Sequence, residues 1–520
     1  MSTDRSVDPA PATGSAAPAG QARGDQRHDL LHGRQHGSTA RVRGARDTGP
    51  QGGPQSLRTR TAAAVRRQPP GAWLTGLAAA ALYILFSVTQ WNQLASPSWD
   101  LGIFTQLAKA YAGFGAPIVP IKGEGFNLLG DHFHPLLVLL APAYALAPSG
   151  LTLLIVQDLL FGLSVAVVAR AGTRFLGPVA GIAVGIAYAL SWGLQSAVAA
   201  QFHEIAFAVP LLALSLEAVL LRRVVPAVVS GGLLVFVKED LGLTVVALGL
   251  VLAWRLRTPA GLWLAAWGAL WLVVSVRVIL PALNAAGQYD YSDRIDVGGM
   301  AADPADAVVG LVSGTAKYET LLLLLVAGGF LFLRSPLGLV LVPTLLWRFA
   351  SSEEWYWGHE WHYSAVLMPV LFLALVDGVH LLRTDPRAWV RTAALAGVPA
   401  AVAACLVLLP AQKFAVLAEP ETYRPSERWD AAHRMMDLIP AGSTVESGVV
   451  LMAYLTPEAR VYWLGNTNPA PDYLIVDADD WSWGGVRPGD AEAHAEQRYP
   501  GTDYTLVFGE DGYQLVEREG

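Results

Sequence analysis

Short polar segments interrupt a largely apolar chain and hold the residue types that acid–base and phosphate chemistry require. A carboxylate can take the proton of a substrate hydroxyl, Lys and Arg can neutralise a phosphate, and His can bind a phosphate or a divalent ion. The candidate catalytic acids are Asp100, Asp131 and Glu204. The candidate substrate-binding residues are His132, His134, His203, Lys238, Glu239, Asp240, Arg348, His359 and His362. Because these residues lie far apart in the sequence, the hypothesis requires a fold that gathers them.

The segment Lys238-Glu239-Asp240 is the most informative of these. It separates apolar runs over residues 224–237 and 241–254, and each run makes a helix of about 21 Å, shorter than an apolar membrane core of about 30 Å. Each of the three charges would cost about 2.5–3.5 kcal/mol if it faced lipid at that depth. The segment therefore predicts a water-filled cavity, and a buried Lys–carboxylate pair without further function is the alternative.

Other candidates also have a purely structural interpretation. Asp100 can cap an amphipathic helix expected over residues 101–111, a role that is compatible with catalysis. His132 and His134 can bond to the backbone at the start of the next helix. The aromatic stretch over residues 355–363 is typical of an interfacial belt, although a belt does not explain its acids and histidines.

Composition assigns the chain to the membrane proteins. Of its 520 residues, 53% are hydrophobic and 15% are charged, whereas soluble domains contain about 25% charged residues. The single cysteine, Cys405, excludes a disulfide framework and a thiolate metal cluster. Residues 1–70 are rich in Arg and contain no aromatic residue, so we expect a disordered cytoplasmic tail. Arg enrichment alone does not indicate nucleic acid, and no nucleic-acid partner is expected.

Apolar runs predict a multi-span α-helical domain over residues 71–410. The eleven expected spans are residues 72–90, 149–169, 176–195, 205–221, 224–237, 241–254, 260–281, 318–333, 336–350, 363–382 and 392–410. With the tail in the cytoplasm, every dense Arg cluster falls on the cytoplasmic side, as is typical of membrane proteins. The polar segments then meet at the outer face. If residues 224–254 formed one bent helix instead of two spans, the orientation of the later Arg clusters would reverse.

Two regions outside the spans complete the organisation. The large first outer loop, residues 91–148, contains an apolar run over residues 136–147 that is too short to cross and is expected to lie in the outer interface. Residues 411–520 alternate helical and strand patterns and predict a small extracytoplasmic α/β domain, in which strands are expected at 461–464, at 473–476 and in a hairpin around Asp511-Gly512. We expect this domain to cover substrate or to bind a partner.

Four polar segments resemble those of a bacterial family of integral membrane proteins known as domain of unknown function 2079. The matching segments are Trp99-Asp100-Leu101-Gly102-Ile103-Phe104-Thr105-Gln106, Leu129-Gly130-Asp131-His132-Phe133-His134-Pro135, Phe202-His203-Glu204 and Val237-Lys238-Glu239-Asp240-Leu241-Gly242. That family is grouped with the C-type glycosyltransferase (GT-C) superfold, whose members move a sugar from a polyprenyl phosphate to an acceptor at the outer membrane face. An acidic residue follows the first span in that superfold, and Asp100 occupies this place.

The resemblance implies roles for several candidates. Asp100 would be the general base, with Asp131 and Glu204 as the next candidates. Lys238 and Arg348 would hold the donor phosphate, and His132, His134 and His203 would bind that phosphate or a divalent metal ion. The implied partners are a polyprenyl-phosphate sugar donor and membrane lipid, whereas the sugar and the acceptor are not defined.

Two other classes of function also fit the residues. A transporter of a small polar or ionic solute would use the same buried charges as its path, although no inverted repeat of interrupted spans is evident. A metal-dependent enzyme of the outer face would use His132, His134, His203 and His359 as ligands.

Overall fold

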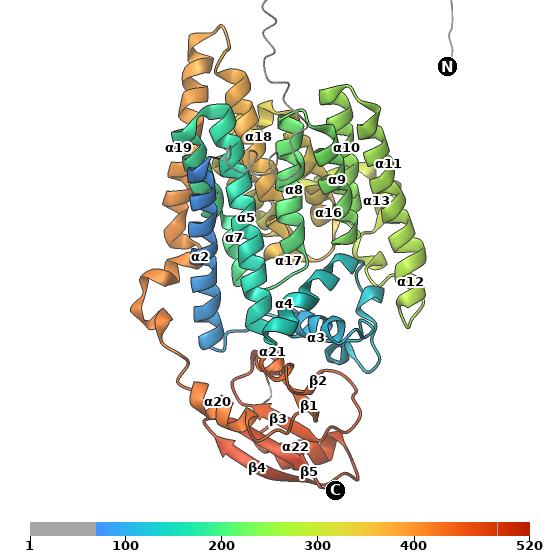
Figure 1. Ribbon diagram of the computed structural model, residues 1–520. Helices are drawn as coiled ribbons and strands as arrows, with labels where there is room; N and C mark the ends of the chain where they lie inside the picture. Colours follow the sequence, from blue (N-terminus) through green and yellow to red (C-terminus); the bar gives the residue numbers. More distant parts are fainter. Residues whose placement is uncertain (1–68, 486, 520) are drawn as a thin grey trace, which may run out of the picture. The chain divides into compact units, whose positions relative to one another are not determined.

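The computed structural model describes residues 69–485 and 487–519. The tail predicted over residues 1–70 lies outside the described residues except for Pro69 and Pro70. The rest of the described chain forms a bundle of apolar helices followed by a small domain that carries a β-sheet, as Figure 1 shows.

Four helices are long and apolar enough to cross a membrane within the described part of the chain. These are α2 (Pro70–Asn92), α5 (Gly150–Leu176), the segment Pro259–Leu283 that contains α11 (Pro259–Val274) and α12 (Leu280–Leu283), and the segment Ala388–Ala411 that contains α19 (Ala388–Leu408). Local sequence explains where two of them begin: the Ser149 and Thr258 side chains accept the backbone N–H groups of Leu151 and Ala260, and Ser and Thr are favoured at helix N-caps.

Three bent helix pairs raise the number of length-compatible spans to as many as seven. They are α6 (Pro178–Ala189) with α7 (Trp192–Ala199), α14 (Pro304–Val312) with α15 (Thr315–Ala327), and residues Glu354–Ser364 with α18 (Leu367–Leu382). Shorter apolar helices are α8 (Ile205–Leu220), α9 (Val224–Gly232), α10 (Leu241–Leu256) and α16 (Val342–Ala350). Each of the eleven predicted segments is mostly helical, although 176–195, 318–333 and 363–382 are interrupted by turns. Eleven crossings and their orientation stay a prediction.

Small residues let neighbouring helices approach closely in the bundle. A Cβ atom at Gly76 of α2 would lie 2.6 Å from the carbonyl oxygen of Gly162 in α5. A Cβ atom at Gly249 of α10 would similarly lie 2.6 Å from the carbonyl oxygen of Gly261 in α11. Close backbone packing of this kind is typical of helices that associate within membranes.

The first large loop is folded over its whole length. It contains α3 (Asp100–Ala112) and an apolar helical segment over residues Pro135–Leu146 that includes α4 (Ala141–Leu146). That segment matches the short apolar helix expected over residues 136–147, whose place in the outer interface stays a prediction. The N-cap residue of α3 is Trp99, whose side chain makes no capping hydrogen bond, and Asp100 is the first residue of the helix itself. The alternative role of Asp100 as a helix cap is therefore wrong.

The C-terminal domain is an α/β fold around five strands. The strands are β1 (Thr444–Ser447), β2 (Arg460–Trp463), β3 (Tyr473–Asp477), β4 (Tyr504–Glu510) and β5 (Tyr513–Arg518), in the order β2-β1-β3-β5-β4. Strand β1 is parallel to both of its neighbours, β2 and β3, whereas β5 is antiparallel to β3 and β4. The helices are α20 (Trp429–Met436), α21 (Met452–Leu455) and α22 (Ala491–Arg498).

The predicted hairpin of this domain is confirmed. Asp511 and Gly512 join β4 to β5 with φ angles of 48° and 79°, and positive φ angles at both turn residues are what a tight hairpin of this kind requires. The predicted strands at 461–464 and 473–476 correspond to β2 and β3, whereas β1 was not predicted. Helix α20 follows Ser426, whose hydroxyl accepts the backbone N–H of Arg428.

Candidate active site

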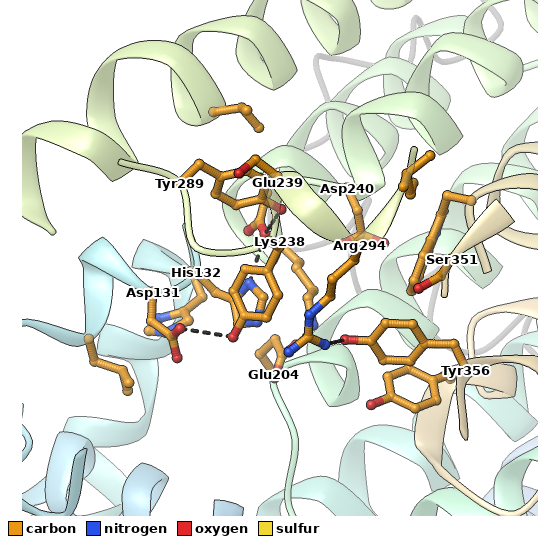
Figure 2. Close-up of a pocket in the computed structure, with 18 of the residues that line it drawn as sticks. Asp131, His132, Glu204, Lys238, Glu239, Asp240, Tyr289, Arg294, Ser351 and Tyr356 are labelled. Atoms are coloured by element: carbon orange, nitrogen blue, oxygen red, sulfur yellow. Dashed lines mark hydrogen bonds and ion pairs between the residues drawn. The ribbon is translucent and has the colours of Figure 1, made fainter. Parts of the chain in front are cut away.

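A cavity of about 1000 Å³ brings together polar residues from five separate parts of the chain. Those of the predicted site residues that line it are Asp100, Asp131, His132, His134, His203, Glu204, Lys238, Glu239, Asp240 and His362. Figure 2 shows several of these side chains pointing toward a common space. The prediction that the fold gathers these segments is therefore met in the structure, while their roles stay predictions.

Asp100 and His203 form a close pair at one side of the cavity. Their nearest side-chain atoms, Oδ2 and Nε2, are 3.4 Å apart. The other ring nitrogen of His203 lies 3.2 Å from the carbonyl oxygen of Gln201, which fixes the ring so that Nε2 faces the carboxylate. Burial by itself would raise the pKa of Asp100, but the charge of His203 outweighs it and lowers that pKa below its usual value. Asp100 is therefore ionised at neutral pH.

Lys238 forms a buried ion pair with Glu204. The ammonium nitrogen lies 2.7 Å from Glu204 Oε1. Burial alone would raise the pKa of Glu204, but Lys238 brings it down to about 2. The neighbouring Asp240 has one carboxylate oxygen without a hydrogen-bond partner, and burial raises its pKa to about 6. The positive charge of Lys238 is thus already compensated by acidic side chains of the protein.

Glu239 organises a second group of contacts. Its Oε1 lies 2.7 Å from His132 Nδ1, its Oε2 accepts the backbone N–H of Phe133 at 3.0 Å, and the Tyr289 hydroxyl donates to Oε1 at 3.2 Å. Burial alone would raise the pKa of Glu239, but the neighbouring His132 lowers it to about 2. Together these bonds hold the loop after α3 against the turn before α10.

Asp131 is bound by groups that sequence reasoning missed. Its carboxylate lies 3.2 Å from Lys122 Nζ and accepts the Tyr291 hydroxyl at 2.8 Å. Lys122 also lies over the ring of Trp99, 4.8 Å from its centroid. Trp99 and Lys122 both line the cavity next to Asp100.

Arg294 is the second cation that sequence reasoning missed. Its guanidinium stacks on Tyr291, 4.5 Å from the ring centroid, and donates to the Tyr356 hydroxyl. Figure 2 shows it reaching into the cavity between the surrounding segments. Only the alternation of Tyr and charged residues over 289–296 could have indicated this loop, because no spacing rule connects it to the other segments.

Two predicted binding residues lie outside the cavity lining. Arg348 is fully buried and donates to the Tyr356 and Gly358 carbonyl groups and to Ser364 Oγ. It therefore supports the aromatic loop from behind. His359 lies 3.5 Å from Glu360 and edge-on to Trp192.

The candidate metal ligands do not converge. His132 bonds to Glu239, His203 pairs with Asp100 and stacks on His362 with 3.6 Å between ring centroids, and burial lowers the pKa of His134 to about 4. Between residues 69 and 519, apart from 486, no three His, Cys, Asp or Glu side chains are arranged to hold a metal ion. The histidine triad proposed as a metal site is thus divided among separate contacts.

Residues 90–515 match the protein family described as "Predicted membrane protein (DUF2079)". The chain belongs to this family. The resemblance seen in the four polar segments is thereby confirmed, and it extends through the C-terminal domain. No curated protein matches the sequence.

Solved structures show where the fold belongs. ArnT from Cupriavidus metallidurans, in a crystal structure bound to undecaprenyl phosphate, is 14% identical with a TM-score of 0.52, and the match covers 85% of this chain and 97% of ArnT. The Archaeoglobus fulgidus oligosaccharyltransferase tethered with an acceptor peptide is 14% identical with a TM-score of 0.40, covering 78% of this chain and 69% of the other. The likeness to ArnT shows a GT-C-like fold and does not by itself assign an activity.

Proposed function

We propose that this protein is a GT-C-like membrane glycosyltransferase that uses a polyprenyl-phosphate-linked sugar at the outer membrane face. The observation that carries the proposal is the placement of an ionised Asp100 in the same cavity as Arg294. A carboxylate that accepts a proton and cations that bind a phosphate are the two parts that such a transfer requires. The structural likeness to ArnT with its undecaprenyl phosphate supports this donor class.

In the proposed reaction, Asp100 accepts a hydrogen bond from the acceptor hydroxyl and takes its proton as that oxygen attacks the anomeric carbon. The bond between this carbon and the phosphate oxygen breaks, and its electron pair leaves with the polyprenyl phosphate. His203 is a positioning residue, since its Nε2 faces the carboxylate and holds it ionised. General-base assistance of this kind contributes about a hundredfold or more to rate.

Arg294 is the cation best placed to bind the donor phosphate. Lys238, one of the two cations expected for this role, is paired with Glu204 at 2.7 Å, and the other, Arg348, lies outside the cavity lining. Arg294 instead lines the cavity, and in the described part of the chain its side chain makes polar contacts with the Tyr356 hydroxyl and with Glu353, at 3.9 Å. A guanidinium has five donors, so it can still make a forked contact with a phosphate.

Apolar residues continue the cavity from these charges toward the helices of the bundle. Leu243, Leu272, Val276 and Pro281 belong to its lining. Such a wall suits the first isoprene units of a lipid-linked donor, because burial of apolar groups against it excludes water. One cavity therefore accommodates a charged head and an apolar chain.

Transfer from synthetic polyprenyl-phosphate sugars to a crude cell-envelope acceptor fraction, followed by the release of free polyprenyl phosphate, tests this proposal. The wild-type protein in proteoliposomes should release polyprenyl phosphate from at least one donor of a panel of pentoses and hexoses. Asp100→Asn should lower that rate about a hundredfold or more. Asp293→Asn is the matched control, because Asp293 is exposed and does not line the cavity. Equal rates for wild type and Asp100→Asn would refute the assignment of Asp100.

A further inference from the structure

Arg277 lies on a helix surface that is otherwise apolar. It belongs to the segment Pro259–Leu283, whose helices α11 and α12 run along one edge of the bundle in Figure 1. Val273, one turn before Arg277, is 58% exposed, and Val278, directly after it, is 59% exposed. Apolar side chains of this kind on a membrane helix pack against lipid chains. Arg277 is exposed on the same segment, and a charge at such a place indicates a function because it is costly there.

The backbone around Arg277 departs from a regular α-helix. Pro281 has no N–H group, so the Arg277 carbonyl oxygen loses the donor that an α-helix supplies from four residues further along. The turn Ser275–Ile279 is accordingly π-helical, and the N–H of Leu280 donates to the carbonyl oxygen of Ser275, five residues before it. Turns of this kind are rare and occur frequently at functional sites.

Arg277 also lines the cavity of the candidate active site. Two further residues of the lining are apolar and exposed: Leu243 of α10 is 38% exposed, and Val297 of α13 (Val297–Ala302) is 70% exposed. The cavity therefore reaches the surface of the protein at Leu243, Arg277 and Val297, which we call the side opening. A lipid at the side opening can keep its chain in the membrane while its head enters the cavity.

The charge of Arg277 has no partner in the protein. In the described part of the chain, its guanidinium makes no hydrogen bond, ion pair or aromatic contact. Lys122 and Lys238, two other cations of the lining, are both paired with carboxylates. The five N–H donors of Arg277 are thus available to an anion that reaches the side opening from outside.

We propose that Arg277 captures the phosphate of the polyprenyl-phosphate-linked donor from the membrane and passes it through the side opening toward Arg294. This inference rests on the proposed donor class. A guanidinium suits the phosphate because it offers forked, charge-assisted hydrogen bonds, and the apolar Leu243 and Val297 suit the polyprenyl chain. Because Arg277 is exposed, it acts on the encounter with the lipid, whereas Arg294 holds the phosphate inside the cavity.

Stopped-flow fluorescence of the purified full-length protein in phosphatidylcholine nanodiscs tests this inference. Energy transfer from the tryptophans of the protein to a dansyl-labelled undecaprenyl phosphate reports binding without a sugar or an acceptor. Arg277→Gln should lower the association rate constant about fivefold, the effect of one interfacial Arg, and should leave the dissociation rate constant within about twofold. Arg294→Lys should instead raise the dissociation rate constant, because it weakens a contact inside the cavity.

Three further variants separate charge, position and shape. Arg257→Gln is the matched control and should bind as the wild type does, because Arg257 is exposed near the other end of the same segment and does not line the cavity. Arg277→Lys keeps the charge and should restore most of the association rate, which a purely structural role of the guanidinium would not. Val297→Trp narrows the side opening without a change in charge and should also slow association, while its exposed position keeps the protein folded.

Two other probes identify the ligand. Inorganic phosphate should not compete with the labelled lipid, and the association of a dansyl-labelled phosphatidylglycerol should depend less on Arg277. Any of four results would overturn the inference: equal association rates for wild type and Arg277→Gln, equal losses in Arg257→Gln and Arg277→Gln, full competition by inorganic phosphate, or equal dependence of both lipids on Arg277. A protein that binds the lipid through Arg277 but transfers no sugar would instead contradict the proposed function alone.

Discussion

Met452 of the C-terminal domain packs directly on Gly102 in the first turn of α3. A Cβ atom on Gly102 would lie 2.8 Å from Met452 Cβ, a separation that side chains do not tolerate. Further along the same face of α3, Gln106 donates to the Val461 carbonyl at 2.8 Å and Lys109 to the Thr456 carbonyl at 2.7 Å. Figure 1 shows α3 beside α21 of this domain. The C-terminal domain thus holds the helix that begins at the proposed catalytic Asp100.

This contact predicts that Gly102→Ala lowers the turnover number of sugar transfer by at least about tenfold, because small displacements of a catalytic group are costly. The KM for the donor should stay near the wild-type value, since Arg294 and Lys122 are not on α3. Kinetics of the purified protein and hydrogen exchange of residues 97–112 measure both effects.

The double variant Gly102→Ala with Met452→Gly serves as the control for this steric argument. Removal of the Met452 Cβ atom makes room for the new methyl group, so part of the lost rate should return. A Gly102→Ala protein with the wild-type turnover number and exchange pattern would show that the C-terminal domain does not position α3.

How far the sequence predicts the site depends on the kind of residue. Lys238 and its neighbours are recognisable because three charges between two short apolar runs are costly in a membrane. Arg294 and Lys122 carry no such signal, since a single cation in a polar loop is ordinary. Arg348 was expected in the cavity, but it bonds to carbonyl groups of the loop behind it, and only the path of that loop determines which way it points.

For the fold as well, some elements could be predicted from the sequence and others could not. Apolar run length predicted the helices of the bundle, and the turn residues Asp511 and Gly512 predicted the hairpin. Strand β1 was missed because its sequence Thr-Val-Glu-Ser is short and contains a single apolar residue. Glu446 in this strand is nonetheless fully buried, and it bonds to Asn468 and Tyr499. Such a tertiary network cannot be recognised from four residues.

The raised pKa of His203 predicts that the stability of the folded protein depends on pH. Burial by itself would lower its pKa, but Asp100 outweighs burial and raises that pKa above 6.5. The protonated His203 therefore stabilises the fold fully below about pH 6.5, and this contribution is lost as pH rises through the raised pKa. Thermal unfolding of the wild type should show the decline, and His203→Gln should show a smaller one. A remainder is expected because His132 also has a raised pKa: burial would lower it, but Glu239 outweighs burial. A decline of equal size in both proteins would exclude His203 as its source.

The Arg clusters predict the membrane orientation. Reporter fusions after Arg223 and Arg257 should report the cytoplasm, and a fusion after Pro425 should report the outer side, because short Arg-rich loops stay inside. A fusion after Asp131 is a useful internal check, since it tests the first loop directly and should report the outer side. A cytoplasmic signal at Pro425 would contradict the eleven-span topology and would remove the proposed outer-face location of the cavity.

Arg294 is expected to determine how tightly the donor phosphate binds. Arg294→Lys keeps the positive charge but loses the forked donors, so the KM for a polyprenyl-phosphate sugar should rise about tenfold, a change of about 1.4 kcal/mol. Tyr356→Phe removes the hydroxyl that accepts from this guanidinium and should give a smaller increase, because the charge and the fork both remain. Arg334→Lys is the control, since Arg334 is outside the cavity lining. If an active Arg294→Lys protein has an unchanged KM, Arg294 does not bind the phosphate, and Lys238 and Lys122 are the next candidates.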